Sequence, residues 1–129
     1  MLVTLKEILS KGKTVAGFNV FGYEDAISVI KGAERVGCPV ILMTNKNAVE
    51  FMPIEALGKL LGVLAENAKV DVCVHLDHST SFANIQRAID SGFTSVMFDG
   101  SQLPLEENIE STKKVVEMAH EKEFLLKLK

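Results

Sequence analysis

The chain has no tryptophan, only two cysteines and only three prolines in 129 residues. Two cysteines are too few for a disulfide scaffold, so we expect Cys38 and Cys73 to be free thiols in a reducing cytoplasm. No run of about eighteen apolar residues occurs, and we therefore expect no membrane-spanning helix. Charges interrupt residues 1–7 before a signal-peptide core can form, so we also expect no secretory signal.

Strong charge of either sign is also missing. The formal net charge is −3, the isoelectric point is near 5.6, and the 14 lysines and arginines are scattered along the chain. A nucleic-acid partner normally requires a clustered basic surface, so this class of function is disfavoured. What the chain does have is 47% hydrophobic and 24% charged residues, which predicts one globular domain over residues 1–129.

Apolar runs alternate with amphipathic stretches along the sequence, as expected for repeated βα units. Glu24 and Asp25 mark the start of a predicted helix that ends at Gly37, and a later helix begins near Thr80 or Ser81 and ends at Gly92. The other predicted helices are 5–11, one that follows Pro53, and 105–122 with an inward stripe of Ile109, Thr112, Val116 and Ala119. The predicted strands start near positions 14, 40, 72, 95 and 124, where 124–128 would begin the fifth strand.

Two α/β architectures accommodate this pattern. Five βα units in 129 residues fit an open, doubly wound sheet of the flavodoxin-like kind, which is complete at about this size. The same units also fit the first half of a (β/α)8 barrel, which needs roughly 250 residues. Periodicity alone does not distinguish the two architectures, so the choice between them depends on the residues at the strand ends.

Polar residues stand where each of the first four predicted strands ends. In an α/β protein the carboxyl ends of parallel strands are where ligands and chemistry collect, so these residues would converge on one rim. The alternative interpretation is purely structural, because such residues often cap helices and tolerate turns. This structural interpretation explains a single asparagine better than it explains an aspartate followed directly by a histidine. The strand-end residues are Asn19, Thr44, Asn45, Asp77, His78 and Asp99.

Two linked segments carry a resemblance to a known family. His75-Leu76-Asp77-His78 is followed by 92–101, which ends in Phe98-Asp99-Gly100-Ser101, and then by 103–109. Together with Gly17-Phe18-Asn19-Val20 and Pro39-Val40-Ile41, these segments resemble the class II, metal-dependent ketose-bisphosphate aldolases. The resemblance implies a (β/α)8 TIM barrel, of which this chain would cover the first four to five βα units.

The resemblance implies reversible aldol cleavage of a ketose 1,6-bisphosphate, such as the fructose or tagatose compound, to dihydroxyacetone phosphate and glyceraldehyde 3-phosphate. The implied cofactor is Zn²⁺, and the resemblance also allows a second divalent cation. By the family pattern Asp77 would be the catalytic acid/base, His78 a zinc ligand and Asp99 a residue of the second cation site. Asn19 and Asn45 are candidates for substrate binding.

The other two histidines have structural interpretations. His75 precedes Asp77 by two residues, so strand alternation places both on one face, whereas His78 would face the other way in a regular strand. We expect His75 to be an interior, hydrogen-bonded residue. His120 lies late in a predicted helix, where an imidazole complements the helix dipole.

The sequence also departs from the family pattern. Two further zinc histidines and the phosphate loops would come from later strands, and the final residues 124–129 carry lysines where glutamates are expected. Gln102 replaces the usual histidine. Three explanations are open: a truncated product, a half that pairs with a second copy or a complementary half, or part of a longer gene product. We favour truncation, and we expect the isolated chain to be inactive or nearly so and to associate or aggregate. The alternative function is a non-catalytic α/β binding domain with a vestigial metal or anion site.

Overall fold

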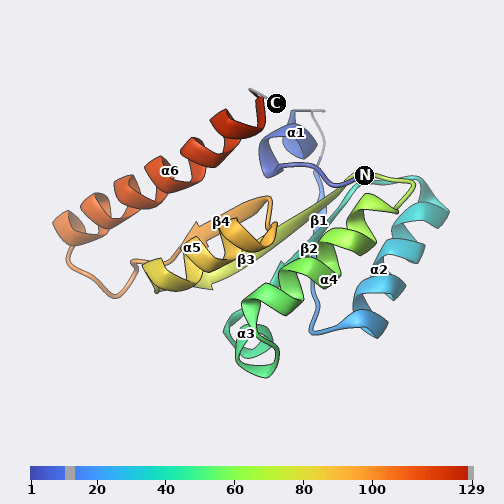
Figure 1. The fold of residues 1–129 in the computed structure, drawn as a ribbon, viewed down its shortest axis with the longest axis horizontal. Coiled ribbons are helices and arrows are strands. Elements are labelled where there is room, and N and C mark those ends of the chain that lie inside the picture. The colour runs from blue at the N-terminus through green and yellow to red at the C-terminus, as the bar shows by residue number, and fades with distance from the viewer. Residues whose placement is uncertain (11–13, 128–129) are drawn as a thin grey trace.

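The structure is a computed structural model that describes residues 1–10 and 14–127, and it contains a four-stranded parallel sheet with helices packed against it (Figure 1). The strands are β1 (Ala16–Asn19), β2 (Val40–Thr44), β3 (Val72–Ser79) and β4 (Ser95–Phe98). The helices are α1 (Leu5–Leu9), α2 (Tyr23–Val36), α3 (Lys46–Phe51), α4 (Ile54–Glu66), α5 (Phe82–Ser91) and α6 (Leu105–Lys127).

The strand order decides between the two architectures. The order is β1-β2-β3-β4, so each strand pairs with its successor and all pairs are parallel. A doubly wound sheet reverses its strand order at a switch point, and this sheet, as far as the structure describes it, has no reversal. Sequential parallel strands with intervening helices are the arrangement of part of a (β/α)8 barrel.

The core lies between the sheet and the helices that follow each strand. Alternate residues of β2 and β3 point to this side and are fully buried, including Leu42 and Val74. Leu57 and Leu61 of α4 pack against them, because α4 places a buried residue at nearly every turn. The opposite side of the sheet, the interior side of a barrel, carries the half-buried Ile41 of β2.

The helix ends lie at the residues that the sequence analysis predicted to begin and end these helices. The carboxylate of Asp25 accepts hydrogen bonds from the backbone N–H groups of Phe21 and Gly22, which fixes the start of α2. Gly37 and Gly92 end α2 and α5 with φ of 67° and 102°, a left-handed conformation that favours glycine. These helix boundaries confirm the sequence prediction.

One helix was not predicted. The short α3 follows β2 directly, and the Asn45 side chain caps it by accepting a hydrogen bond from the N–H of Ala48 at 3.2 Å. Met52 then adopts an extended conformation before α4 begins. The unit after β2 therefore contains two helices where the sequence predicted one.

The C-terminal helix differs from the prediction in two respects. Helix α6 continues through residues 124–127, so the predicted fifth strand is wrong over these residues, while Leu128 lies outside the described residues. The predicted inward stripe is also wrong for Ile109, Thr112 and Val116, which are exposed. Val115 is buried instead, and Ala119 of the predicted stripe is partly buried. The buried face is rotated from the predicted one, because the helix packs through Val115 beside α5 and β4.

Within the described residues, no helix is long and apolar enough to cross a membrane.

Candidate functional site

The strand-end pair Asp77 and His78 lies within the last part of β3, which runs on to Ser79. Between Leu76 and Ser79 the register with β4 shifts, and His78 has a φ of 49°. A positive φ is rare for a residue other than glycine, and it breaks the alternation of a regular strand. The opposite orientation of His78 was expected only for a regular strand, and here the irregularity turns His78 to the same side as Asp77.

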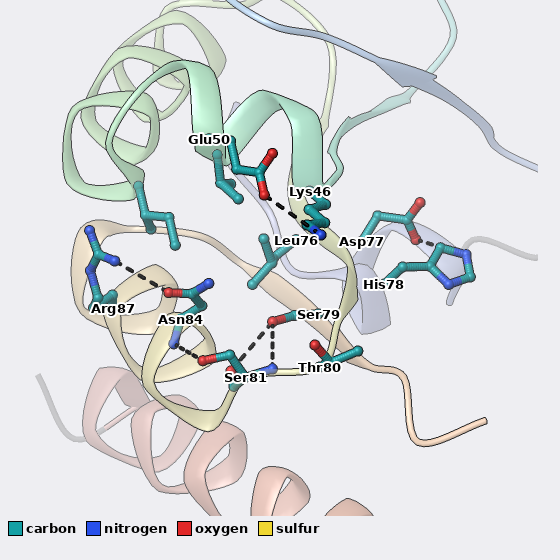
Figure 2. Close-up of a pocket in the computed structure, with 12 residues that line it drawn as sticks. Lys46, Glu50, Leu76, Asp77, His78, Ser79, Thr80, Ser81, Asn84 and Arg87 are labelled. Carbon is teal, nitrogen blue, oxygen red and sulfur yellow. Dashed lines mark hydrogen bonds and ion pairs between the residues drawn. The ribbon is translucent and has the colours of Figure 1, made fainter. Parts of the chain in front are cut away.

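His78 lies between two carboxylates. Its Nδ1 atom is 2.8 Å from Oδ2 of Asp99, and its Nε2 atom is 3.9 Å from Oδ1 of Asp77. Figure 2 shows Asp77 and His78 projecting from β3 on the side away from Asn84 and Arg87. The three residues that the resemblance assigned to catalysis and cation binding are thus brought together at the ends of two neighbouring strands.

Backbone contacts hold Asp99 in place. Its N–H donates to the carbonyl oxygen of Ser79 at 2.8 Å, and its Oδ1 accepts a hydrogen bond from the N–H of Ser101 at 3.0 Å. The hydrogen bond from His78 and those from Ser101 lower the pKa of Asp99 to about 2. In turn, the hydrogen bond to Asp99 and the nearby Asp77 charge raise the pKa of His78 above its usual value. The geometry favours an ionised Asp99.

His75 behaves as the sequence predicted. Its Nδ1 atom is 2.7 Å from the Ser95 hydroxyl, and its side chain is largely buried. Burial lowers its pKa, although the nearby Asp77 carboxylate opposes this effect. Its Nε2 atom lies 3.6 Å from Oδ1 of Asp77, so His75 supports that carboxylate from the interior side of the strand.

The two asparagines proposed for substrate binding lie apart from this cluster. The side-chain oxygen of Asn45 caps α3, which is the structural role considered for strand-end asparagines. Asn19 is exposed on β1, which β2 separates from the strand of Asp77. The structure therefore brings Asp77, His78 and Asp99 together and leaves Asn19 and Asn45 outside the cluster.

A cavity of about 290 Å³ adjoins the cluster, and Asp77 and His78 line it together with residues of α3, α4 and α5. Its cationic residues are already paired, since Arg87 binds both carboxylate oxygens of Glu55 at 2.6 and 2.8 Å, and Lys46 lies 3.7 Å from Glu50. Polar groups at the start of α5 line the same cavity (Figure 2). The sequence analysis singled out two of its lining residues, Asp77 and His78, and the capping signal near Ser81 also lies at this cavity, but the cavity itself was not predicted.

The cluster offers fewer ligands than a zinc ion needs. A catalytic zinc usually takes three protein ligands and keeps one position open. In the described part of the chain, no group of three or more histidine, cysteine, aspartate or glutamate side chains is placed to hold a metal ion. These residues therefore do not fit a zinc ion by themselves. Within the cluster, Asp99 holds Nδ1 of His78, which leaves Nε2 of the same ring as the atom best placed to contact a cation.

The family model for fructose-bisphosphate aldolase class II matches residues 1–127. The chain belongs to this family. The match includes β3 and β4 with Asp77, His78 and Asp99, so it covers the cluster as well as the fold. The family resemblance predicted from the sequence motifs is confirmed.

Relatives named fructose-bisphosphate aldolase are identical to the chain at more than a third of the aligned residues. A fructose-bisphosphate aldolase of Staphylococcus aureus is 39% identical over 128 residues, and one of Thermus caldophilus is 40% identical over 124 residues. The matches cover 94% and 93% of this chain but only 45% and 40% of those proteins. The chain thus spans less than half the length of these relatives.

Solved structures agree on the fold. The YdjI aldolase from Escherichia coli K12 superposes with a TM-score of 0.84 and 32% identity, covering 93% of this chain and 47% of that one. A fructose-bisphosphate aldolase from Campylobacter jejuni gives a TM-score of 0.77 at 20% identity, covering 91% and 43%. These neighbours are TIM-barrel aldolases, so the sheet of this chain corresponds to about half of such a barrel, and the predicted fold class is confirmed.

Proposed function

We propose that this chain supplies one half of a class II aldolase site for reversible aldol cleavage of a ketose 1,6-bisphosphate, such as the fructose or tagatose compound, to dihydroxyacetone phosphate and glyceraldehyde 3-phosphate. The observation that carries the proposal is the position of His78 between the Asp77 and Asp99 carboxylates. The family match over this same segment supports it.

Asp77 is the proposed acid/base. In cleavage, the carboxylate accepts the proton of the substrate hydroxyl whose oxygen becomes the aldehyde, and in condensation it returns that proton. Its side chain is only 13% exposed, and His75 and His78 flank it at 3.6 and 3.9 Å. The two neighbouring imidazoles restrict the space around the carboxylate, which favours proton transfer to a positioned hydroxyl.

His78 and Asp99 are the proposed contributions of this chain to cation binding. Because Asp99 occupies Nδ1, the Nε2 atom of His78 is left as the ligand atom. Carboxylates that orient a ligating imidazole in this way are common around zinc, and Asp99 also has a second oxygen for another cation. The remaining ligands of a zinc site would come from outside the described residues, so we expect little or no turnover from this chain alone.

The alternative is a non-catalytic α/β domain that keeps a vestigial site. The small number of ligands favours it, since among the described residues no group of three or more histidine, cysteine, aspartate or glutamate side chains is placed to hold a metal ion. Zinc uptake that is equally weak in the chain and in a His78→Ala variant would leave only this alternative.

The aldolase proposal is tested by cleavage of fructose 1,6-bisphosphate in a coupled assay, with zinc added and with zinc removed by a chelator. We expect a low zinc-dependent rate that Asp77→Asn removes, because asparagine keeps the shape of the side chain but accepts no proton. His120→Asn, on the exposed part of α6, is the matched control and should leave the rate unchanged. A rate that Asp77→Asn leaves intact would contradict the role of Asp77.

The substrate proposal and a cytoplasmic location are extensions of the family match. The substrate proposal, a phosphorylated ketose, rests on the family match. The proposed location is consistent with the two free cysteines, because free thiols are usual in a reducing compartment. The single domain over residues 1–129 stays a prediction.

A further inference from the structure

A network of polar side chains joins β3 and β4 next to the proposed site. His75 and Ser95 are partners in the register of the two strands, and Nδ1 of His75 lies 2.7 Å from the Ser95 hydroxyl. Nε2 of the same ring lies 3.6 Å from Oδ1 of Asp77. All three residues belong to neighbouring strands that the structure describes, so the network rests on contacts within this chain.

One end of the network is a group that can only donate. The backbone N–H of Val74 donates to the Thr94 hydroxyl at 3.1 Å, and that hydroxyl donates to Sγ of Cys73 at 3.7 Å. A further hydrogen bond joins the Cys73 thiol to the Ser95 hydroxyl. Burial raises the pKa of Cys73 to about 11, so the thiol keeps its hydrogen at neutral pH and is able to donate it to Ser95. The donors therefore run from Val74 toward His75.

The other end of the network is a group that only accepts. The proposed acid/base role requires an ionised Asp77, and an ionised carboxylate has no hydrogen to donate. Burial lowers the pKa of His75 and keeps the ring neutral, so only one of its nitrogens carries a hydrogen. Because the Ser95 hydroxyl can donate or accept, the Asp77 charge decides that this nitrogen is Nε2. Both ends of the network therefore impose the same direction.

We propose that His75 is a positioning residue for Asp77: the Ser95 hydroxyl holds Nδ1 of the ring, so that Nε2–H points at Oδ1 of the carboxylate. This inference rests on the proposed role of Asp77 as the acid/base. The separation of 3.6 Å is longer than a hydrogen bond, and catalytic hydrogen bonds are often long before substrate binds and tighten in the complex. With both nitrogens engaged, His75 offers no atom to a cation.

The positioning role also decides which oxygen of Asp77 acts as the base. Both neighbouring imidazoles approach Oδ1, with Nε2 of His75 at 3.6 Å and Nε2 of His78 at 3.9 Å. Because Oδ1 faces the two rings, Oδ2 is the oxygen that accepts the proton of the substrate hydroxyl. A donor at Oδ1 keeps Oδ2 in one direction, which proton transfer to a positioned hydroxyl requires.

The first measurement is the tautomer of His75, from long-range nitrogen–proton NMR correlations at alkaline pH. We expect Nε2–H for His75 and the opposite tautomer for His78, whose hydrogen Asp99 holds at Nδ1. A dominant Nδ1–H form of His75 in the parent chain would overturn the proposal.

The Ser95 hydroxyl is tested in the same spectra. Ser95→Ala should shift the Nδ1 signal of His75, and Ser95→Thr, which keeps a hydroxyl, should return this signal toward the parent value. Ser28→Ala removes an exposed hydroxyl from α2 and is the control, which should leave the signal unchanged. A His75 signal that does not respond to Ser95→Ala would show that the hydroxyl does not hold the ring.

The second measurement is the χ1 rotamer of Asp77, from three-bond couplings of its carboxyl carbon to the backbone. His75→Gln and His75→Asn form a matched pair, because the glutamine amide nitrogen lies near the position of Nε2 and the asparagine amide nitrogen near that of Nδ1. We expect one dominant Asp77 rotamer in the parent and in His75→Gln, and averaged couplings in His75→Asn. Circular dichroism checks that each variant is folded.

Three results of the coupling measurement would overturn the proposal. The first is averaged Asp77 couplings in the parent chain. The second is a His75→Asn variant with the parent couplings, which would mean that the carboxylate is held without the donor. The third is equal averaging in both His75 variants, which would assign the effect to packing of the ring. Ser95→Ala changes no ring atom and should also broaden the distribution of Asp77 rotamers, so it carries the test if a His75 variant does not fold.

Neither measurement depends on cleavage, so the positioning role and the acid/base role fail separately. The expected tautomer and rotamers, together with a cleavage rate that Asp77→Asn leaves intact, would contradict the acid/base role and support the positioning of the carboxylate. A rate that Asp77→Asn removes, together with averaged Asp77 couplings in the parent chain, would overturn the positioning role alone.

Discussion

The Nδ1 atom of His78 lies 2.8 Å from Oδ2 of Asp99, and this contact joins the ends of β3 and β4. The pKa of Asp99 is lowered to about 2, so at neutral pH its carboxylate is ionised and only accepts hydrogen bonds. The hydrogen atom between the two residues therefore belongs to the His78 ring. The contact fixes which nitrogen of His78 carries a proton when the ring is neutral.

We predict that neutral His78 is the Nδ1–H tautomer, with Nε2 unprotonated. Long-range nitrogen–proton NMR correlations at alkaline pH measure this directly. Asp99→Asn should weaken the preference, because an amide can act as donor as well as acceptor. His120 serves as the reference imidazole in the same spectrum. A dominant Nε2–H form of His78 in the parent chain would mean that the contact with Asp99 does not orient the ring.

The two thiols should differ sharply in reactivity. Cys73 is fully buried, and burial raises its pKa to about 11, whereas Cys38 is exposed. Because the thiolate is the reactive form, Ellman's reagent at about pH 8 should label one thiol per native chain. Cys38→Ser should remove this fast reaction, and denaturant should release the second thiol. Equal native reaction of both thiols would show that β3 is not packed as described.

The ion pair between Glu55 and Arg87 should give a pH-dependent contribution to stability. The hydrogen bond from Arg87 lowers the pKa of Glu55 from 4.5 to about 2. A lowered folded-state pKa stabilises the fold above the unfolded value and loses this effect as pH falls through the folded value. Glu55→Gln should therefore lower the unfolding midpoint at about pH 6 and have progressively less effect between about pH 4.5 and pH 2.

The Glu55 effect is small because both side chains are about half exposed, and it should shrink in about 1 M salt as charges are screened. Urea titrations of both proteins at each pH give the comparison. A difference between the two proteins that grows on acidification would contradict the assigned direction.

Packing of α4 against the sheet is tested by two substitutions on the same helix. Leu61 is fully buried and Val63 is 57% exposed. Leu61→Ala should reduce the free energy of unfolding by about 2 to 5 kcal/mol, because it removes buried carbons and leaves a cavity. Val63→Ala should change it by less than about 0.5 kcal/mol. Similar losses for the two variants in urea titrations would mean that the helix is rotated from the described orientation.

The sequence predicted most elements because their signals are local. The strand 95–98 and the helix ends at Gly37 and Gly92 follow from a short apolar run and from the backbone that glycine permits. The motif around Asp77 and His78 identified the family before any geometry was known. These features depend on a few neighbouring residues.

Other features depend on contacts between distant segments, which periodicity does not contain. Residues 124–127 are apolar enough for a strand but continue α6, and the buried side of that helix is set by its contact with α5 and β4. The φ of 49° at His78 arises where the register between β3 and β4 shifts. Strand alternation, which holds for a regular strand, therefore could not place His78.

The most direct test of the proposed site is zinc binding by the purified chain, measured by titration against a fluorescent zinc indicator. The proposal places one zinc-binding imidazole on β3, at Nε2 of His78. We predict weak zinc uptake that His78→Ala abolishes, and that His120→Ala, on the exposed face of α6, leaves unchanged. Equal zinc uptake by the parent chain and both variants would contradict the assignment of His78.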